Sequence, residues 1–251
     1  LILDKRNEFG FNIKSRILKK ITNLPIIKRL YENQVKLTKS HIDSYLTYRN
    51  YIFQNSERVK YLLSKYKIKD STLFDSVKNF KYNNEIYACL YLENLDKIDE
   101  INKLIDFKNV KSVFEIGGGF GSNIHILLQN FENIKKVIYL DISPNIFIGT
   151  EYLRHFYNEA VIDYLDSKDK EIKFSNNDKL EIFCITPWQL PKIKSKIDYF
   201  HNAHSFQEMT PSIIKNYSTH INNLLNDKGF ISLALYINNN IKIVQMDEII
   251  N

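Results

Sequence analysis

Apolar residues recur at helical spacing in the first part of the chain. From residue 11 to 66 they fall mostly three or four positions apart, with little glycine and a single proline, Pro25. The stretch 84–105 repeats this spacing, which predicts a second helical region. The segment between them, 67–76, predicts a connection with a short helix or turn. We therefore expect residues 1–105 to form a helical N-terminal cap region.

The pattern changes at residue 110, where short β-branched or aromatic runs alternate with longer amphipathic ones. This alternation is typical of βαβ units around a parallel sheet. Strands are predicted over 110–116, 136–141, 180–185, 197–203 and 230–237. Helices are predicted over 122–131, 144–157 and 211–225, the last two with Ser143 and Thr210 as candidate N-caps before a proline. Residues 106–251 are thus expected to form an α/β domain.

Composition narrows the class of protein. With 251 residues, 44% of them hydrophobic and 25% charged, the chain can bury one substantial core and lies outside the range of disordered proteins. Cys89 and Cys184 lie in apolar stretches and predict buried thiols of a reducing compartment. No apolar run reaches the ~20 residues that cross a bilayer, and no leader pattern is present. We expect a cytoplasmic protein.

The net charge of +6 is concentrated at one end. Residues 1–40 hold ten Lys and Arg against three Asp and Glu, so they carry +7 and the remaining chain −1. Nucleic-acid binding would need a basic face beside the chemistry, which argues against a nucleic-acid partner. Two interpretations of the basic helices stay open: peripheral contact with an anionic membrane or acidic partner, and a solvated Lys-rich face.

The stretch VFEIGGGFGS contains four of the seven glycines of the chain, between a predicted strand and a predicted helix. Glycine allows positive φ angles and close approach of a ligand to the backbone. A dinucleotide-binding G-x-G-x-x-G turn would need glycine at position 122, where the chain has Ser122. The acid-x-G-x-G-x-G pattern, with Glu115 as the acid, is complete, and it resembles the first motif of class I methyltransferases.

Charge separates the two interpretations of this turn. NAD brings a pyrophosphate, which favours a helix N-terminus free of acids, whereas S-adenosylmethionine brings a sulfonium cation and an amino acid tail. Glu115 favours the cation. Asp141, which ends the second predicted strand, suits the ribose of either cofactor and does not discriminate. A turn that needs glycine only for its backbone angles is the remaining alternative.

The resemblance extends to three segments: FEIGGGFG, IYLDISPNIFIGTEYL and DYFHNAHSFQEMTP. Together they resemble a sugar O-methyltransferase family of bacterial surface-polysaccharide clusters over residues 110–236, and the S-F-Q-E-M run is the selective part. The resemblance implies a Rossmann-like class I methyltransferase sheet, S-adenosylmethionine as the methyl donor, and a sugar hydroxyl acceptor in surface-polysaccharide or nucleotide-sugar biosynthesis.

The resemblance also implies a set of cofactor-binding residues. Glu115 and the glycine turn would line the methionine end, Asp141 and Ile142 would hold the ribose and flank the adenine, and Asn202 would lie by the sulfonium. Trp188 follows the third strand, where it suits either a cover for the adenine or a partly exposed core position. The full set is Glu115, Gly117, Gly118, Gly119, Gly121, Asp141, Ile142, Trp188 and Asn202.

Candidate catalytic residues follow the fourth predicted strand, at the sheet edge where α/β proteins bind ligands. A sugar hydroxyl needs a base to accept its proton, and His204 and Glu208 are the candidates for this role. His204 as an ordinary loop residue, and Glu208 as a helix N-terminal carboxylate, are the alternatives. The carboxylates show no spacing that indicates a metal site.

Two rival functions remain open at this stage. One is an NAD-dependent oxidoreductase or epimerase, which the incomplete G-x-G-x-x-G turn and the missing Tyr-x-x-x-Lys helix disfavour. The other is a non-catalytic cofactor-binding module of a polysaccharide-assembly protein. A complete class I domain continues beyond the fifth strand, whereas only NNNIKIVQMDEIIN follows here, and Leu1 is not a methionine. We therefore expect a C-terminal truncation or replacement, and a fragment of a longer protein.

Overall fold

The computed structural model describes residues 56–69, 72 and 79–235, all within one compact unit, Arg49–Asn251. The helices predicted before residue 56, the basic residues of 1–40, and the end of the chain after residue 235 lie outside the described residues. None of the described helices is long and apolar enough to cross a membrane.

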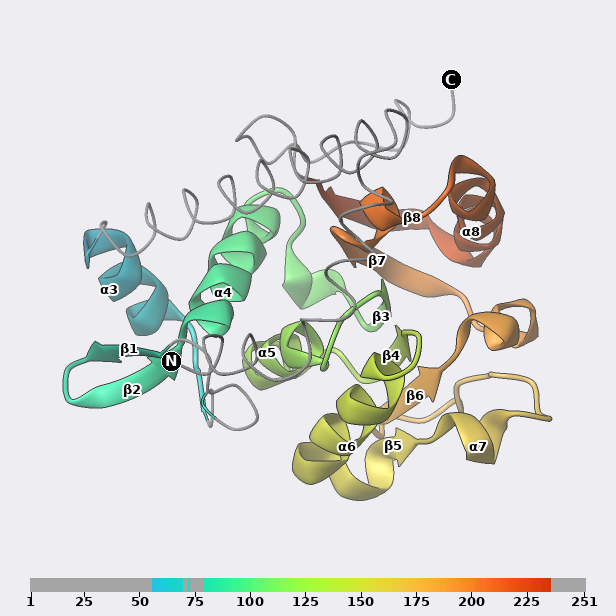
Figure 1. The fold of residues 1–251 in the computed structure, drawn as a ribbon, viewed down its shortest axis with the longest axis horizontal. Helices are drawn as coiled ribbons and strands as arrows, with labels where there is room; N and C mark the ends of the chain where they lie inside the picture. The colour runs from blue at the N-terminus through green and yellow to red at the C-terminus, as the bar shows by residue number, and fades with distance from the viewer. Residues whose placement is uncertain (1–55, 70–71, 73–78, 236–251) are drawn as a thin grey trace, which may run out of the picture. The chain divides into compact units, whose positions relative to one another are not determined.

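A single parallel sheet of six strands organises the described residues (Figure 1). The strand order is β5-β6-β4-β3-β7-β8, and every neighbouring pair is parallel. The strands are β3 (Ser112–Ile116), β4 (Lys136–Leu140), β5 (Val161–Ile162), β6 (Glu181–Ile185), β7 (Ile197–Ala203) and β8 (Leu225–Ala234). This arrangement confirms the predicted Rossmann-like α/β fold.

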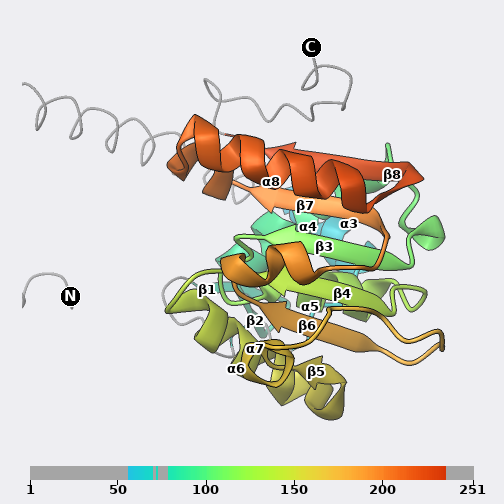
Figure 2. The same ribbon diagram turned by 90° about the vertical axis from the view of Figure 1, so that its right-hand side faces the viewer.

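Helices cover both faces of the sheet (Figures 1 and 2). One core cluster joins the sheet to α4 (Cys89–Asn102), α5 (Ser122–Asn130) and α6 (Asn145–Tyr157), and the other joins it to α8 (Pro211–Leu224). The remaining described helices are α3 (Ser56–Lys65), α7 (Tyr164–Ser167) and the 3-10 helices η1 (Phe107–Asn109), η2 (Asn158–Ala160), η3 (Pro187–Lys192) and η4 (Ser205–Glu208). Because successive side chains of a strand point to opposite faces of the sheet, β3 contributes residues to both clusters. Val113 packs into the first cluster and Phe114 into the second.

The prediction of a helix from residue 84 was wrong at its start. Residues Asn79–Tyr82 (β1) and Glu85–Ala88 (β2) pair as an antiparallel hairpin, and α4 begins only at Cys89. The two residues between the strands, Asn83 and Asn84, have φ angles of 47° and 67°. Asparagine tolerates this left-handed conformation, which two-residue hairpin turns require. The Asn-Asn pair was therefore the missed signal.

The predicted helix caps need correction as well. Pro144, rather than Ser143, occupies the N-cap of α6, and no side chain caps that helix. Thr210 is at the N-cap of α8, as predicted, but makes no capping hydrogen bond. Its hydroxyl pairs instead with Ser212 Oγ at 3.0 Å.

A buried carboxylate on α4 holds α3 in place. Asp99 is fully buried and accepts hydrogen bonds from Arg58 Nη1 at 2.8 Å, Lys65 Nζ at 2.7 Å and the Tyr66 hydroxyl at 2.9 Å. Burial alone would raise the pKa of Asp99, but these hydrogen bonds lower it to about 2. The ion pair therefore contributes to stability at neutral pH.

Replacing this carboxylate should loosen the contact between the two helices. We expect Asp99→Asn to lower the free energy of unfolding by on the order of 2 kcal/mol at pH 7, because two partly exposed cations lose their counter-charge. The folded pKa lies below the unfolded one, so the difference should shrink as the pH falls from about 4 to 2. Urea denaturation measures both effects.

A matched control is Lys60→Ala, which breaks the exposed pair with Glu57. This variant should unfold like the wild type, since exposed pairs contribute little. Equal loss of stability in the two variants would contradict the role of Asp99.

Candidate functional site

The predicted site residues converge at the carboxyl edge of the sheet around β3. This strand is the point at which the chain order reverses, because β4 pairs on one side of it and β7 on the other. Open parallel sheets bind their ligands outside the carboxyl ends of the strands at such a switch point. The loop 117–121 leaves β3 there and enters α5.

Two glycines of this loop serve different purposes. Both Gly117 and Gly119 have positive φ angles, +73° and +60°. A Cβ at Gly117 would overlap the Ser205 side chain, whereas a Cβ at Gly119 would have no atom within 4 Å. Gly117 is therefore required by packing against the next loop, and Gly119 presents open backbone to a ligand.

Asp141 fixes the open part of the loop. Its Oδ2 accepts a hydrogen bond from Gly119 N at 2.9 Å, and its Oδ1 accepts one from Ile142 N at 2.7 Å. Only 5% of the residue is exposed. Burial raises the pKa of Asp141 despite these hydrogen bonds, and the charge of Glu208 adds to the rise.

Glu115 is a buried carboxyl group whose hydrogen bonding is incomplete. Its Oε1 accepts a hydrogen bond from Asn123 Nδ2 at 2.8 Å, while its Oε2 has no partner among the described residues. Burial, with a contribution from the nearby charge of Asp141, raises the pKa of Glu115 to about 8, against the opposing effects of the Asn123 hydrogen bond and the charge of Lys97. Buried polar groups of this kind are unusual unless a ligand completes them. A cationic group would satisfy both the free oxygen and the charge.

Asn202 joins the two loops at the sheet edge. It is fully buried, and its Nδ2 donates to Ile116 O at 2.9 Å and to Ser205 Oγ at 2.6 Å. Its Oδ1 accepts from Phe206 N at 3.2 Å. The amide thus connects the end of β3 to η4. A position beside the reacting sulfonium stays a prediction.

His204 lies beside a lysine that the sequence patterns did not indicate. Its Nε2 is 3.4 Å from Lys97 Nζ on α4. Burial, together with the positive charge of Lys97, lowers the pKa of His204 to about 3. His204 is therefore neutral at pH 7 and resists protonation. Lys97 was missed because a lysine on an amphipathic helix usually indicates a solvated position.

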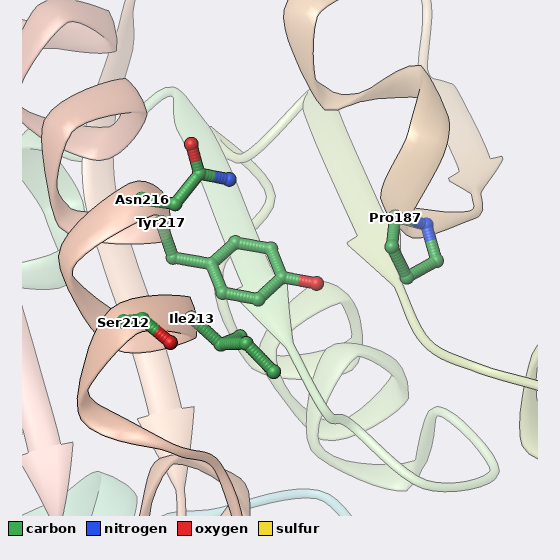
Figure 3. A pocket seen from close by; sticks show the side chains of 5 residues that line it. All are labelled: Pro187, Ser212, Ile213, Asn216 and Tyr217. Atoms are coloured by element: carbon green, nitrogen blue, oxygen red, sulfur yellow. The ribbon is translucent and has the colours of Figure 1, made fainter.

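A pocket of about 360 Å³ opens between the start of η3 and α8 (Figure 3). Tyr217 projects from α8 with its hydroxyl toward Pro187. Burial raises the pKa of Tyr217, and the charge of Asp141 contributes to the rise. The pocket is lined by Pro187, Ser212, Ile213, Asn216 and Tyr217.

The two predicted adenine-side residues, Ile142 and Trp188, are largely exposed, at 62% and 65%. This exposure shows that Trp188 is not a core residue in the described structure. Trp188 directly follows Pro187, which lines the pocket. Within residues 56–69, 72 and 79–235, no group of three or more His, Cys, Asp or Glu side chains is arranged to hold a metal ion.

No protein-family model matches the sequence, and no curated protein matches it. Among solved structures, mitomycin 7-O-methyltransferase MmcR is 14% identical, with a TM-score of 0.38, over 58% of this chain and 39% of its own. CalS10 with bound SAM, an amino pentose methyltransferase from Micromonospora echinaspora, is 12% identical, with a TM-score of 0.38, over 58% and 50%. An O-methyltransferase family protein from Burkholderia thailandensis is 10% identical, with a TM-score of 0.41, over 58% and 38%.

The matched part thus spans half or less of the length of these three proteins. Similarities of this size do not carry a function over to the present chain.

The protonation state of Glu115 can be tested without any ligand. Its folded pKa of about 8 lies above its ordinary value of 4.5, so folding takes up a proton between these pH values. Wild-type stability should therefore fall with rising pH in this window, by at most about 1.4 kcal/mol per pH unit. Glu115→Gln should lack this contribution and gain stability relative to the wild type as the pH is raised from 5 to 8.

Denaturant titrations at several pH values measure this difference. Glu171→Gln, which replaces an exposed carboxylate, serves as the control and should follow the wild-type curve. Parallel curves for wild type and Glu115→Gln would show that Glu115 is ionised in the folded protein.

Proposed function

We propose that this chain binds S-adenosylmethionine at the carboxyl edge of its sheet and transfers the methyl group to a sugar hydroxyl. The observation that carries the proposal is the Glu115 carboxyl group, buried with one free oxygen beneath an open glycine loop that Asp141 holds in place. This combination suits a ligand with an ammonium group at one end and hydroxyl groups further along.

The described residues fit the parts of this cofactor. Glu115 would accept the ammonium group of the methionine end, and the exposed backbone at Gly119 would lie along it. Asp141 keeps lone pairs for ribose hydroxyls beyond its two backbone hydrogen bonds. The pocket that Tyr217 lines offers a largely apolar place for the adenine, which Ile142 would flank in this proposal. When bound, the cofactor supplies an electrophilic methyl group on a sulfonium.

The same features disfavour a nicotinamide dinucleotide. A pyrophosphate at the N-terminus of α5 would approach the Glu115 carboxyl group, which would repel it above about pH 8, where that group is ionised. The sulfonium cofactor gains from that ionisation.

The acceptor lies on the side of β7 and η4 in this proposal. His204 resists protonation beside Lys97, whereas Glu208 is exposed. Glu208 is therefore the group that we expect to accept the hydroxyl proton, with His204 orienting the acceptor. A sugar acceptor, in surface-polysaccharide or nucleotide-sugar biosynthesis, rests on the sequence resemblance alone. We also propose a cytoplasmic location, and contact of the basic N-terminal segment with anionic membranes. Both proposals rest on the sequence.

Calorimetry tests cofactor choice. S-adenosylmethionine and S-adenosylhomocysteine should both bind the folded chain, and NAD should not. Asp141→Asn should weaken their binding by about tenfold or more, because it removes the negative charge that accepts hydrogen bonds from the glycine loop and, in this proposal, from the ribose hydroxyls. Asp178→Asn, at an exposed loop position, is the matched control. Binding of NAD without binding of either sulfur cofactor would overturn the proposal.

Transfer is tested by release of S-adenosylhomocysteine in the presence of free sugars and nucleotide sugars. Glu208→Gln should lower turnover by about a hundredfold, as expected for a lost general base, with cofactor affinity unchanged. His204→Ala should raise the KM of the acceptor more than it lowers kcat. Glu159→Gln, an exposed residue of η2, is the control.

Retained turnover in both Glu208→Gln and His204→Ala would remove the acid-base assignment. Cofactor binding without methylation of any sugar would instead favour a non-catalytic cofactor-binding module.

A further inference from the structure

Three polar side chains occupy one rung of the sheet across three neighbouring strands. Glu115 of β3 pairs in register with His201 of β7, and His201 pairs with Ser232 of β8. Their exposed fractions are only 2%, 3% and 1%. Tyr199, two residues before His201 on the same face, is 1% exposed. Buried polar groups at neighbouring sheet positions are costly unless they satisfy one another.

Three of these groups form a closed hydrogen-bonded triangle. Ser232 Oγ lies 2.6 Å from the Tyr199 hydroxyl and 2.6 Å from His201 Nδ1, and the Tyr199 hydroxyl lies 3.2 Å from the same nitrogen. The second ring nitrogen, His201 Nε2, points the other way and lies 3.9 Å from Glu115 Oε1.

Counting hydrogens within the triangle favours one tautomer of His201. If Nδ1 carried the hydrogen, it would donate to Ser232, Ser232 would donate to Tyr199, and the Tyr199 hydrogen would have no acceptor within the triangle. If Nδ1 is bare, Tyr199 donates to Ser232 and Ser232 donates to Nδ1, so every hydrogen is used. The satisfied arrangement therefore leaves the ring hydrogen on Nε2, facing Glu115.

The charges around this rung keep the ring neutral. Burial, with contributions from Lys97 and His204, lowers the pKa of His201 to about 3. Glu115 is faced by His201 from β7, by Lys97 from α4, by Asn123 from α5 and by Asp141 from the end of β4. His201 therefore presents a fixed N–H dipole to Glu115 and adds no second charge.

We propose that His201 is a positioning residue for the cofactor: its Nε2–H supports the ionised form of Glu115, and Ser232 and Tyr199 hold the ring in the donating tautomer. This inference rests on the proposed function. The separation of 3.9 Å is longer than a hydrogen bond. In this proposal the distance belongs to the ligand-free state, in which the carboxyl group is protonated. When the group ionises against the ammonium group of the ligand, it becomes a stronger acceptor for the Nε2–H. Asn123 and His201 would then share Oε1 and leave Oε2 for the ligand.

The consequence is a pH profile of cofactor affinity that His201 controls. Glu115 has to lose its proton to pair with the ammonium group, so affinity should rise with pH until the carboxyl group is ionised. Without the donor on Nε2, ionisation becomes harder, and the midpoint of this rise should move to higher pH.

The matched variants are His201→Gln and His201→Asn. The amide nitrogen of glutamine can reach the place of Nε2 and keep the donor toward Glu115, whereas asparagine reaches only the place of Nδ1. The dissociation constant of S-adenosylhomocysteine is measured by calorimetry from about pH 6 to 8.5, with folding checked by thermal unfolding. We expect His201→Asn to raise the midpoint by about one pH unit and to weaken binding about tenfold at pH 7, and His201→Gln to resemble the wild type.

A second ligand separates this role from a structural one. 5′-Methylthioadenosine has the adenine, the ribose and the sulfur but no ammonium group, so its affinity should not depend on pH or on His201. Failure of the wild type to bind S-adenosylhomocysteine would overturn the proposed function itself. Binding with an unchanged midpoint in His201→Asn, or an equal loss for both ligands, would overturn the positioning role alone.

Discussion

A carboxyl group buried beneath a glycine loop is the constraint around which the site is arranged. Glu115 lies on the central strand of the sheet, where its charge cannot be solvated, and among the described residues only one of its oxygens has a hydrogen-bond partner. Strand β7 supplies His201 and helix α5 supplies Asn123 around it, and Asp141 holds the loop above it by a hydrogen bond to Gly119. A protein that retains an unfavourable group in its core gains by pairing it with a ligand, and the proposed cation provides that pair.

The sequence alone predicted most of the sheet, because apolar runs separated by amphipathic segments have few other solutions. It also placed Glu115, Asp141 and Asn202 at one edge, since the carboxyl ends of parallel strands meet there. The hairpin of β1 and β2 was missed because its strands are short and next to a helical pattern. β5 has two residues, too few to show a period, and β8 begins five residues earlier than the predicted strand.

The missing parts of the site come from contacts between distant segments. Lys97 meets His204 across 107 positions of sequence, and His201 meets Ser232 across 31. No local pattern distinguishes these residues from a solvated lysine or an ordinary strand histidine. The protonation of His204 likewise depends on a neighbour from another element. Residue types and spacing could therefore indicate where the candidate site lies, but not which neighbouring side chains set the protonation of its residues.

The missing Cβ of Gly117 also has a mechanical consequence. The Ser205 side chain fills the space above this glycine and, through Asn202, is tied to the end of β3. The glycine loop and η4 are thereby interlocked, so neither can swing outward without displacing the other. Any movement of the glycine loop that lets a ligand reach the buried Glu115 carboxyl group is therefore coupled to movement of η4.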